Sequence, residues 1–175
     1  MEDFHQQLLQ WNAFFSSTAQ VSGGLVGLVF VALTFKPEAM GLSGADGDIG
    51  LRKLARQTFA DFINVLLVSL LMLVPYSGVQ IGYSMALVGG LGLQRVVRSV
   101  IAVLRHRDAA SKRSVLLRFW LSFLGNTALT LAGVGLGLGR IREDIFWSLM
   151  FAALILLLIS GARSAWMLVM HDSGD

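Results

Sequence analysis

The sequence predicts an all-α protein: a polytopic transmembrane helical bundle of about five helices, forming one domain over residues 1–175. Of its residues 55% are hydrophobic and only 14% are charged, whereas a soluble domain carries about 25% charged residues. Five stretches are long and apolar enough to cross a hydrocarbon core, which takes roughly 20 helical residues. Lysine and arginine gather in alternate connections, a pattern typical of multi-pass membrane proteins.

The predicted crossings are separated by short polar segments. The crossings span residues 13–35, 58–74, 78–97, 115–138 and 145–170. Segment 37–50 is rich in glycine and predicts a flexible loop, with Asp48 as the N-cap of the following helix. Segment 75–78 begins with proline and predicts a tight turn that joins the second and third crossings into a hairpin. Glu143 and Asp144 are expected to cap the last helix.

The basic residues predict the orientation. With five crossings, every lysine and arginine except Arg140 and Arg142 falls on one side of the membrane. Because cytoplasmic loops hold these residues, we expect the N-terminus outside and the C-terminus in the cytoplasm. The net charge of +3 does not indicate a nucleic-acid partner, since topology alone explains where the charges lie. The densest basic group is expected to contact anionic lipid headgroups. Its members are Arg95, Arg98, Arg105, Arg107, Lys112, Arg113 and Arg118.

Three predicted helices carry small or polar residues along one face. The first has Ser16, Gln20, Gly23 and Gly27; the third has Gly78, Gly82, Ala86, Gly90, Gln94 and Arg98; the fourth has Asn126, Thr130, Gly133 and Gly137. Such faces let two helix backbones approach closely in lipid. The row that begins at Gly78 predicts a groove that receives another helix. Two interpretations remain open: packing inside one protomer, or the lining of an oligomer interface or a pore.

Asp61 lies about one turn inside the second predicted crossing, and Asn64 follows on the same face. An ionisable side chain at that depth is costly unless it is paired or hydrated. Arg98, Arg118 and Arg163 fall in the same leaflet, so each is a candidate partner. A structural pair is one interpretation. Gating, proton coupling or ion coordination is the other.

No motif predicts catalysis, a metal site or a cofactor. The chain has no cysteine, which excludes thiolate chemistry and cysteine-ligated metals. His5, His106 and His171 lack metal-ligand spacing. The alternating glycines of segment 133–139 follow no predicted strand, so they are not a dinucleotide-binding fingerprint. We therefore expect a protein that is not an enzyme.

Two segments carry a resemblance to a known family. Trp11-Asn12-x-Phe14-Phe15 with the following Gly23–Leu33, and the later Leu70–Pro75, resemble a family of small bacterial multi-pass inner-membrane proteins. Some members carry the label of modulator of a membrane AAA protease. The resemblance implies a location in the bacterial inner membrane and supplies no catalytic residues.

Two functions follow as expectations. The first is a homo-oligomeric assembly that forms an ion-conducting pore or channel, because a five-helix protomer has no soluble domain and no room for an internal transport repeat. The polar faces of the first and fourth crossings would supply its lining. The alternative is an accessory protein that binds another membrane protein, such as a membrane protease, through its glycine-rich faces and its basic connection.

Overall fold

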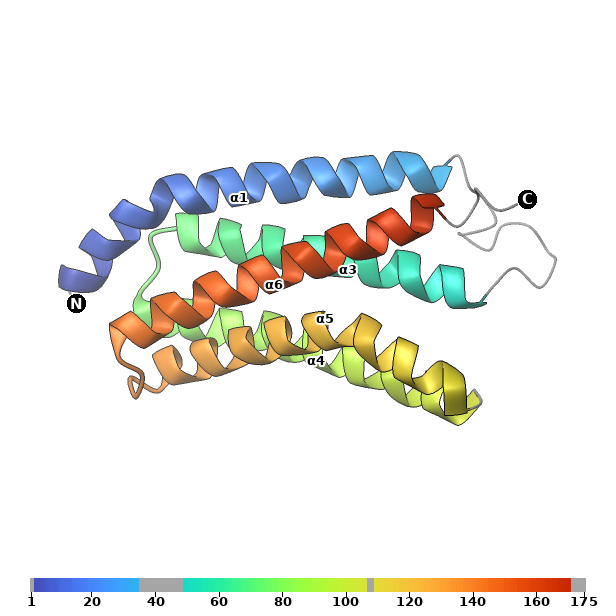
Figure 1. Cartoon of the computed structure of the whole chain (residues 1–175). Helices are drawn as coiled ribbons and strands as arrows, with labels where there is room; N and C mark the ends of the chain where they lie inside the picture. Colours follow the sequence, from blue (N-terminus) through green and yellow to red (C-terminus); the bar gives the residue numbers. More distant parts are fainter. Residues whose placement is uncertain (1, 35–48, 107–108, 171–175) are drawn as a thin grey trace.

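The computed structural model describes residues 2–34, 49–106 and 109–170, and these ranges form five α-helices without a strand. The helices are α1 (Glu2–Thr34), α3 (Ile49–Leu73), α4 (Gly78–His106), α5 (Ala109–Gly137) and α6 (Glu143–Met170). They run alternately up and down in one elongated bundle (Figure 1). The start of α1 and the α3–α4 and α5–α6 connections lie at one end, and the end of α6 lies at the other (Figure 1). The predicted all-α bundle is confirmed.

Four of the five helices are long and apolar enough to cross a membrane, which makes the chain a multi-pass membrane protein. The candidate spans are Leu8–Thr34, Ala55–Leu73, Phe119–Gly137 and Asp144–Met167. The third predicted crossing, over residues 78–97, is not among them, although α4 begins at the predicted residue. The reason is composition: this segment contains five glycines, which contribute little hydropathy, and the polar Gln80, Gln94 and Arg95.

The helices extend beyond most of the predicted crossings. α1 begins at Glu2, near the start of the chain, and α4 continues to His106, where the sequence predicted a polar loop. A helix need not end where the hydrocarbon ends, because arginine and leucine are good helix formers in water as well. The predicted loop at 37–50 and its N-cap Asp48 lie almost wholly outside the described residues, apart from Ile49 and Gly50, the first residues of α3.

The α3–α4 connection is a turn, as the sequence predicted, and the turn caps the start of α4. The Ser77 hydroxyl accepts the Gln80 backbone N–H at 3.4 Å, and the Gln80 side-chain oxygen accepts the Ser77 backbone N–H at 3.3 Å. This reciprocal pair is a capping box, which satisfies two backbone donors at the start of α4. Pro75 precedes it and prevents α3 from continuing.

The α5–α6 connection is closed by a Schellman motif. Gly139 has φ +63°, and its N–H donates to the Leu136 carbonyl at 3.1 Å. The Arg140 N–H donates to the Gly135 carbonyl at 3.0 Å. Glycine suits this position because the left-handed conformation carries no Cβ penalty there.

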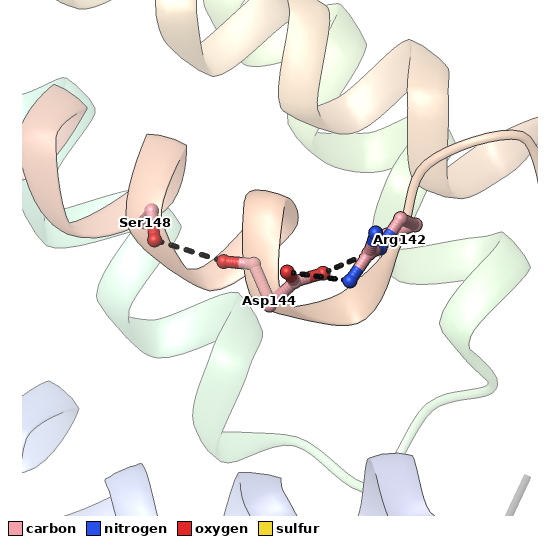
Figure 2. Close-up of polar contacts among 3 residues, drawn as sticks. All are labelled: Arg142, Asp144 and Ser148. Atoms are coloured by element: carbon pink, nitrogen blue, oxygen red, sulfur yellow. Dashed lines mark hydrogen bonds and ion pairs between the residues drawn. The ribbon is translucent and has the colours of Figure 1, made fainter.

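Arg142 and Asp144 hold the start of α6 (Figure 2). The Arg142 guanidinium donates to both Asp144 carboxylate oxygens, at 3.2 and 3.1 Å, and both side chains are largely exposed. Ser148 donates to the Asp144 carbonyl at 2.8 Å (Figure 2). Asp144 therefore stands in the first turn of α6, where the sequence predicted a capping acid.

The core lies where α3, α4, α5 and α6 meet. Val65, Met85, Leu129 and Leu154, one from each of these helices, are fully buried. The closest pair is α4 with α5, while α6 packs against α5 and α3. α1 lies along one side of the bundle, mainly against α3 (Figure 1).

Aromatic rings join α1 to α6 near the N-terminus. Trp11 stacks on Trp147 with ring centroids 5.7 Å apart and planes 5° apart. Phe15 is fully buried beside them, and Phe14 contacts Phe151. The Trp11–Phe15 segment, which carries part of the family resemblance, therefore has a packing role in this fold.

Candidate functional site

A buried polar cluster surrounds Asp61, which is only 1% exposed. Asp61 Oδ1 accepts hydrogen bonds from Gln57 Nε2 and Ser122 Oγ, each at 2.8 Å. Asp61 Oδ2 accepts one from Ser160 Oγ at 2.8 Å. The three donors come from α3, α5 and α6, so this one carboxyl group links three helices.

An amide pair extends the same cluster along the bundle. Asn64 Nδ2 donates to Asn126 Oδ1 at 3.0 Å, and Asn126 Nδ2 donates to the Ser122 carbonyl at 2.8 Å. We call the whole set the polar cluster. It consists of Gln57, Asp61, Asn64, Ser122, Asn126 and Ser160, all of them buried.

Arg98 and Arg163 were predicted as partners of Asp61, and for these two arginines the prediction is wrong. Both are exposed, and neither lies within ion-pair distance of the carboxyl group. The side chain of Arg118 lies outside the described residues. Neutral hydroxyl and amide donors surround the carboxyl group instead. Polar side chains that bond across helices are a recognised source of helix association in lipid.

Sequence reasoning missed Gln57, Ser122 and Ser160. Gln57 and Ser122 stand four residues before Asp61 and Asn126, respectively, so helical spacing could have grouped each pair on one face. Ser160 has Ser164 four residues later on the same face of α6, but it lies 99 residues after Asp61, so spacing alone could not have joined it to the carboxyl group.

The glycine groove predicted on α4 is filled by α5 of the same chain. A Cβ added at Gly82 would lie 2.8 Å from the Gly137 Cα and 2.9 Å from the Gly133 carbonyl oxygen. One added at Gly89 would lie 2.7 Å from Thr130 Oγ1. The predicted stripe of α5 is therefore a packing face inside the protomer. It does not line a surface of the molecule.

The groove does not follow the predicted row of every fourth residue. From Gly82 onward the buried positions of α4 alternate steps of three and four: Gly82, Met85, Gly89, Gly92 and Val96. Steps of four advance about 40° each around a helix with 3.6 residues per turn. The predicted row therefore leaves the interface, so a Cβ at Gly90 would meet nothing within 4 Å, and Gln94 and Arg98 are exposed. Gly78, at the start of the row, is half-buried.

One row of small and polar residues of α1 lies on an open surface, which we call the outer face of α1 and which consists of Ser16, Gln20, Gly24 and Gly27. Gln20, Gly24 and Gly27 are exposed, and Ser16 is half-buried one turn before Gln20. A Cβ at Gly24 or Gly27 would meet nothing within 4 Å. Gly23 is closer to the bundle, but an added Cβ would only reach Leu66 of α3 at 3.9 Å. Gln20 has one weak hydrogen bond, from Nε2 to Ser16 Oγ at 3.5 Å.

The basic group at the α4–α5 connection is only partly described. Arg95 is half-buried and Arg98 is exposed. The other five members fall outside the described side chains: Arg105, Arg107, Lys112, Arg113 and Arg118.

Comparisons with protein-family models, with curated proteins and with solved structures give no match to this chain. The fold thus defines a class, the multi-pass helical membrane protein, and no family. The resemblance of the Trp11–Phe15 and Leu70–Pro75 segments to bacterial inner-membrane proteins stays a prediction.

Proposed function

We propose that the protein is a homo-oligomeric membrane assembly in which the α1 helices of neighbouring copies meet along the outer face of α1 and surround an ion-conducting path. The observation that carries this proposal is Gln20. It is exposed, it lies near the middle of the span Leu8–Thr34, and its one described hydrogen bond is a weak one to Ser16.

A glutamine in this position favours a second copy. Its carboxamide has two N–H donors and a carbonyl oxygen with two lone pairs, and leaving them unpaired in hydrocarbon costs free energy. The same carboxamide on a symmetry-related copy is a complementary partner, since the donor of one meets the acceptor of the other. Gly24 and Gly27 allow the two backbones to approach, because neither has a side chain in the way.

Ion conduction is the activity that this arrangement supports best. Several α1 helices around an axis would present Ser16 and Gln20 toward it, and hydroxyl and amide oxygens can replace part of the hydration shell of an ion. The polar cluster of Asp61 has a different part in the proposal. It ties α3, α5 and α6 together inside each protomer, so that the protomer stays folded whether or not it is assembled.

The proposal includes five crossings, with α4 as the one that composition alone does not identify. α4 runs antiparallel to α5 and lies against it from Gly82, beside Gly137, to Gly92, beside Asn126. A reporter that is active only outside the cytoplasm is expected to be active at the N-terminus, Ser77 and Glu143. We expect it to be silent at Ser111 and Asp175. Activity at Ser111 would contradict five crossings with the N-terminus outside.

Cysteine cross-linking in native membranes tests the oligomer directly, because the chain has no cysteine of its own. Gln20→Cys and Gly24→Cys are expected to give disulfide-linked dimers on mild oxidation, since a disulfide needs Cβ atoms about 4 Å apart. Leu131→Cys is the matched control: Leu131 is exposed and lies within the span of α5. Equal cross-linking at all three positions, or none at Gln20 and Gly24, would remove α1 from the interface.

Conduction needs a separate assay. Vesicles that contain the wild-type protein are expected to release a monovalent cation faster than empty vesicles, and vesicles with Gln20→Leu are expected to match the empty ones. If the α1 helices cross-link but the vesicles show no cation flux, the protein forms an assembly that does not conduct ions, and the conduction part of the proposal is wrong.

The second candidate is an accessory protein, and the same outer face of α1 supports it. The partner would then be a transmembrane helix of another membrane protein, such as a membrane protease. In that case Gln20→Cys gives no homodimer in the purified protein, yet a photo-activated cross-linker attached to the thiol of this variant gives a larger species in the native membrane. The bacterial inner membrane, implied by the resemblance, is the location we propose for either function.

A further inference from the structure

A narrow apolar groove separates α4 from α5 toward the end of the pair that holds His106 and Ala109. Its volume is about 230 Å³, and its lining is formed by Val97, Val100, Ile101, Phe119, Trp120 and Phe123. Trp120 is 57% exposed and stacks on Phe123, with ring centroids 6.2 Å apart. Ile101 is exposed on the opposite wall. Small-molecule sites usually measure about 300–1,000 Å³ and hold placed polar groups, so this groove suits a thin, wholly apolar ligand.

The groove lies where the hydrocarbon ends. The predicted third crossing ends at Val97, and Val97 and Trp120 both line the groove. Tryptophan is enriched at membrane–water interfaces, where its ring sits at the level of the headgroups. A groove at this depth opens toward lipid chains on one side and toward headgroups on the other.

Charge around the groove indicates what kind of headgroup fits. Arg98 is exposed, adjoins Val97 in the chain and stands three residues before Ile101, so it lies beside the groove on α4. Over residues 78–137 the sequence has one acidic residue, Asp108, against seven lysine and arginine residues. A guanidinium binds phosphate with two parallel hydrogen bonds, and a basic surface at this depth attracts anionic lipid.

We infer that this groove binds one acyl chain of an anionic glycerophospholipid, with the lipid phosphate held by Arg98 at its rim. The inference is independent of the proposed oligomer, because the groove lies between α4 and α5 and contains no residue of α1.

Native mass spectrometry of the purified full-length chain with equal amounts of phosphatidylglycerol and phosphatidylcholine tests the site. We expect the wild type to retain phosphatidylglycerol about fivefold better, the preference that roughly one interfacial arginine provides. Arg98→Gln is expected to abolish this preference and to keep chain binding. Val100→Trp is expected to lower retention of both lipids, because the indole occupies the groove.

Two matched controls make the result specific. Arg163→Gln removes an exposed arginine from α6, and Val79→Trp adds an indole at an exposed position near the other end of α4. Both are expected to retain lipids as the wild type does. Equal retention of the two lipids by the wild type would overturn the inference, and so would an equal loss of preference in Arg163→Gln and Arg98→Gln. If Val100→Trp does not fold, the comparison of Arg98→Gln with Arg163→Gln still tests whether Arg98 binds the lipid phosphate.

Discussion

The interior of the bundle and the outer face of α1 contain the same small and polar residue types, but these residues are packed and hydrogen-bonded in the interior and exposed on α1. In the interior, Asp61 accepts three hydrogen bonds, and an added methyl group at Gly82 would clash with the backbone of α5. On α1, Gln20 has one weak bond and Gly24 has open space beside it. The contrast shows that small and polar residues in a membrane helix identify a surface meant for contact. They do not reveal whether the contact lies within the chain or beyond it.

Among the substitutions considered, Asp61→Leu should lower the stability of the protomer most, because it removes the acceptor of three buried hydrogen bonds. The hydroxyls of Ser122 and Ser160 and the amide of Gln57 would lose a partner at once, and a buried unpaired donor costs about 1–3 kcal/mol. We expect almost no folded protein by detergent gel filtration. Asp61→Asn keeps an acceptor oxygen and should lose about 1 kcal/mol. Wild-type yield of Asp61→Leu would mean that the polar cluster is not needed for folding.

Gly82→Ala should cause the second largest loss of stability. The added methyl group meets backbone atoms, which cannot rotate away as a side chain can. Overpacking of this kind costs about 1–3 kcal/mol. Gly90→Ala is the control on the same helix, since a Cβ there meets nothing within 4 Å; its effect should stay within about 0.5 kcal/mol. Denaturation of both variants by sodium dodecyl sulfate in mixed micelles measures the difference. The same loss in both would show that α4 and α5 are not packed through this face.

Gln20→Leu should leave the protomer intact and weaken the assembly. Interhelical hydrogen bonds in lipid contribute about 0.6–2 kcal/mol, so the concentration at which copies separate should rise about 3- to 30-fold. Fluorescence energy transfer between labelled copies in vesicles of varied protein density would measure it. Gln94→Leu, the same change at an exposed position of α4, serves as control. A shift in Gln94→Leu as large as that in Gln20→Leu would argue against α1 as the contact.

Arg142→Gln should have the smallest effect of the four. The ion pair with Asp144 is exposed, and exposed pairs contribute about 0–1 kcal/mol. We expect unfolding in mixed micelles to change by less than about 1 kcal/mol. A larger loss would indicate that the α5–α6 connection depends on this pair more than on the Schellman motif before it.

Most of the fold could be predicted because apolar length and turn chemistry are local properties. Pro75 and Ser77 mark the α3–α4 turn without any knowledge of the rest of the chain. The extent of α4 beyond residue 97 could not be predicted in this way. The length of an apolar segment indicates where the helix leaves the hydrocarbon, but α4 continues past that point.

The site was predictable only in part. The sequence of a single helix indicates which of its side chains are buried, but it does not indicate which side chains of other helices they contact. Asp61 and Asn64 were identified from their depth in an apolar segment, and both are buried in the polar cluster. The choice of an arginine as partner failed because it rested on leaflet position, which ignores how each helix is rotated. Gly82 and Gly90 illustrate the same limit: both belong to one row in the sequence, and only Gly82 faces α5.

The glycines of α4 also bear on how the protein enters the membrane. Each glycine that lets α5 approach is a position without an apolar side chain, and this leaves α4 below the hydropathy of the other four helices. In the five-crossing arrangement α4 leaves the ribosome before α5 exists to cover it. Its residence in the bilayer must then depend on the synthesis of α5, so the two helices form one unit of insertion. Truncation after residue 106 should release α4 from the membrane, while truncation after residue 142 should retain it.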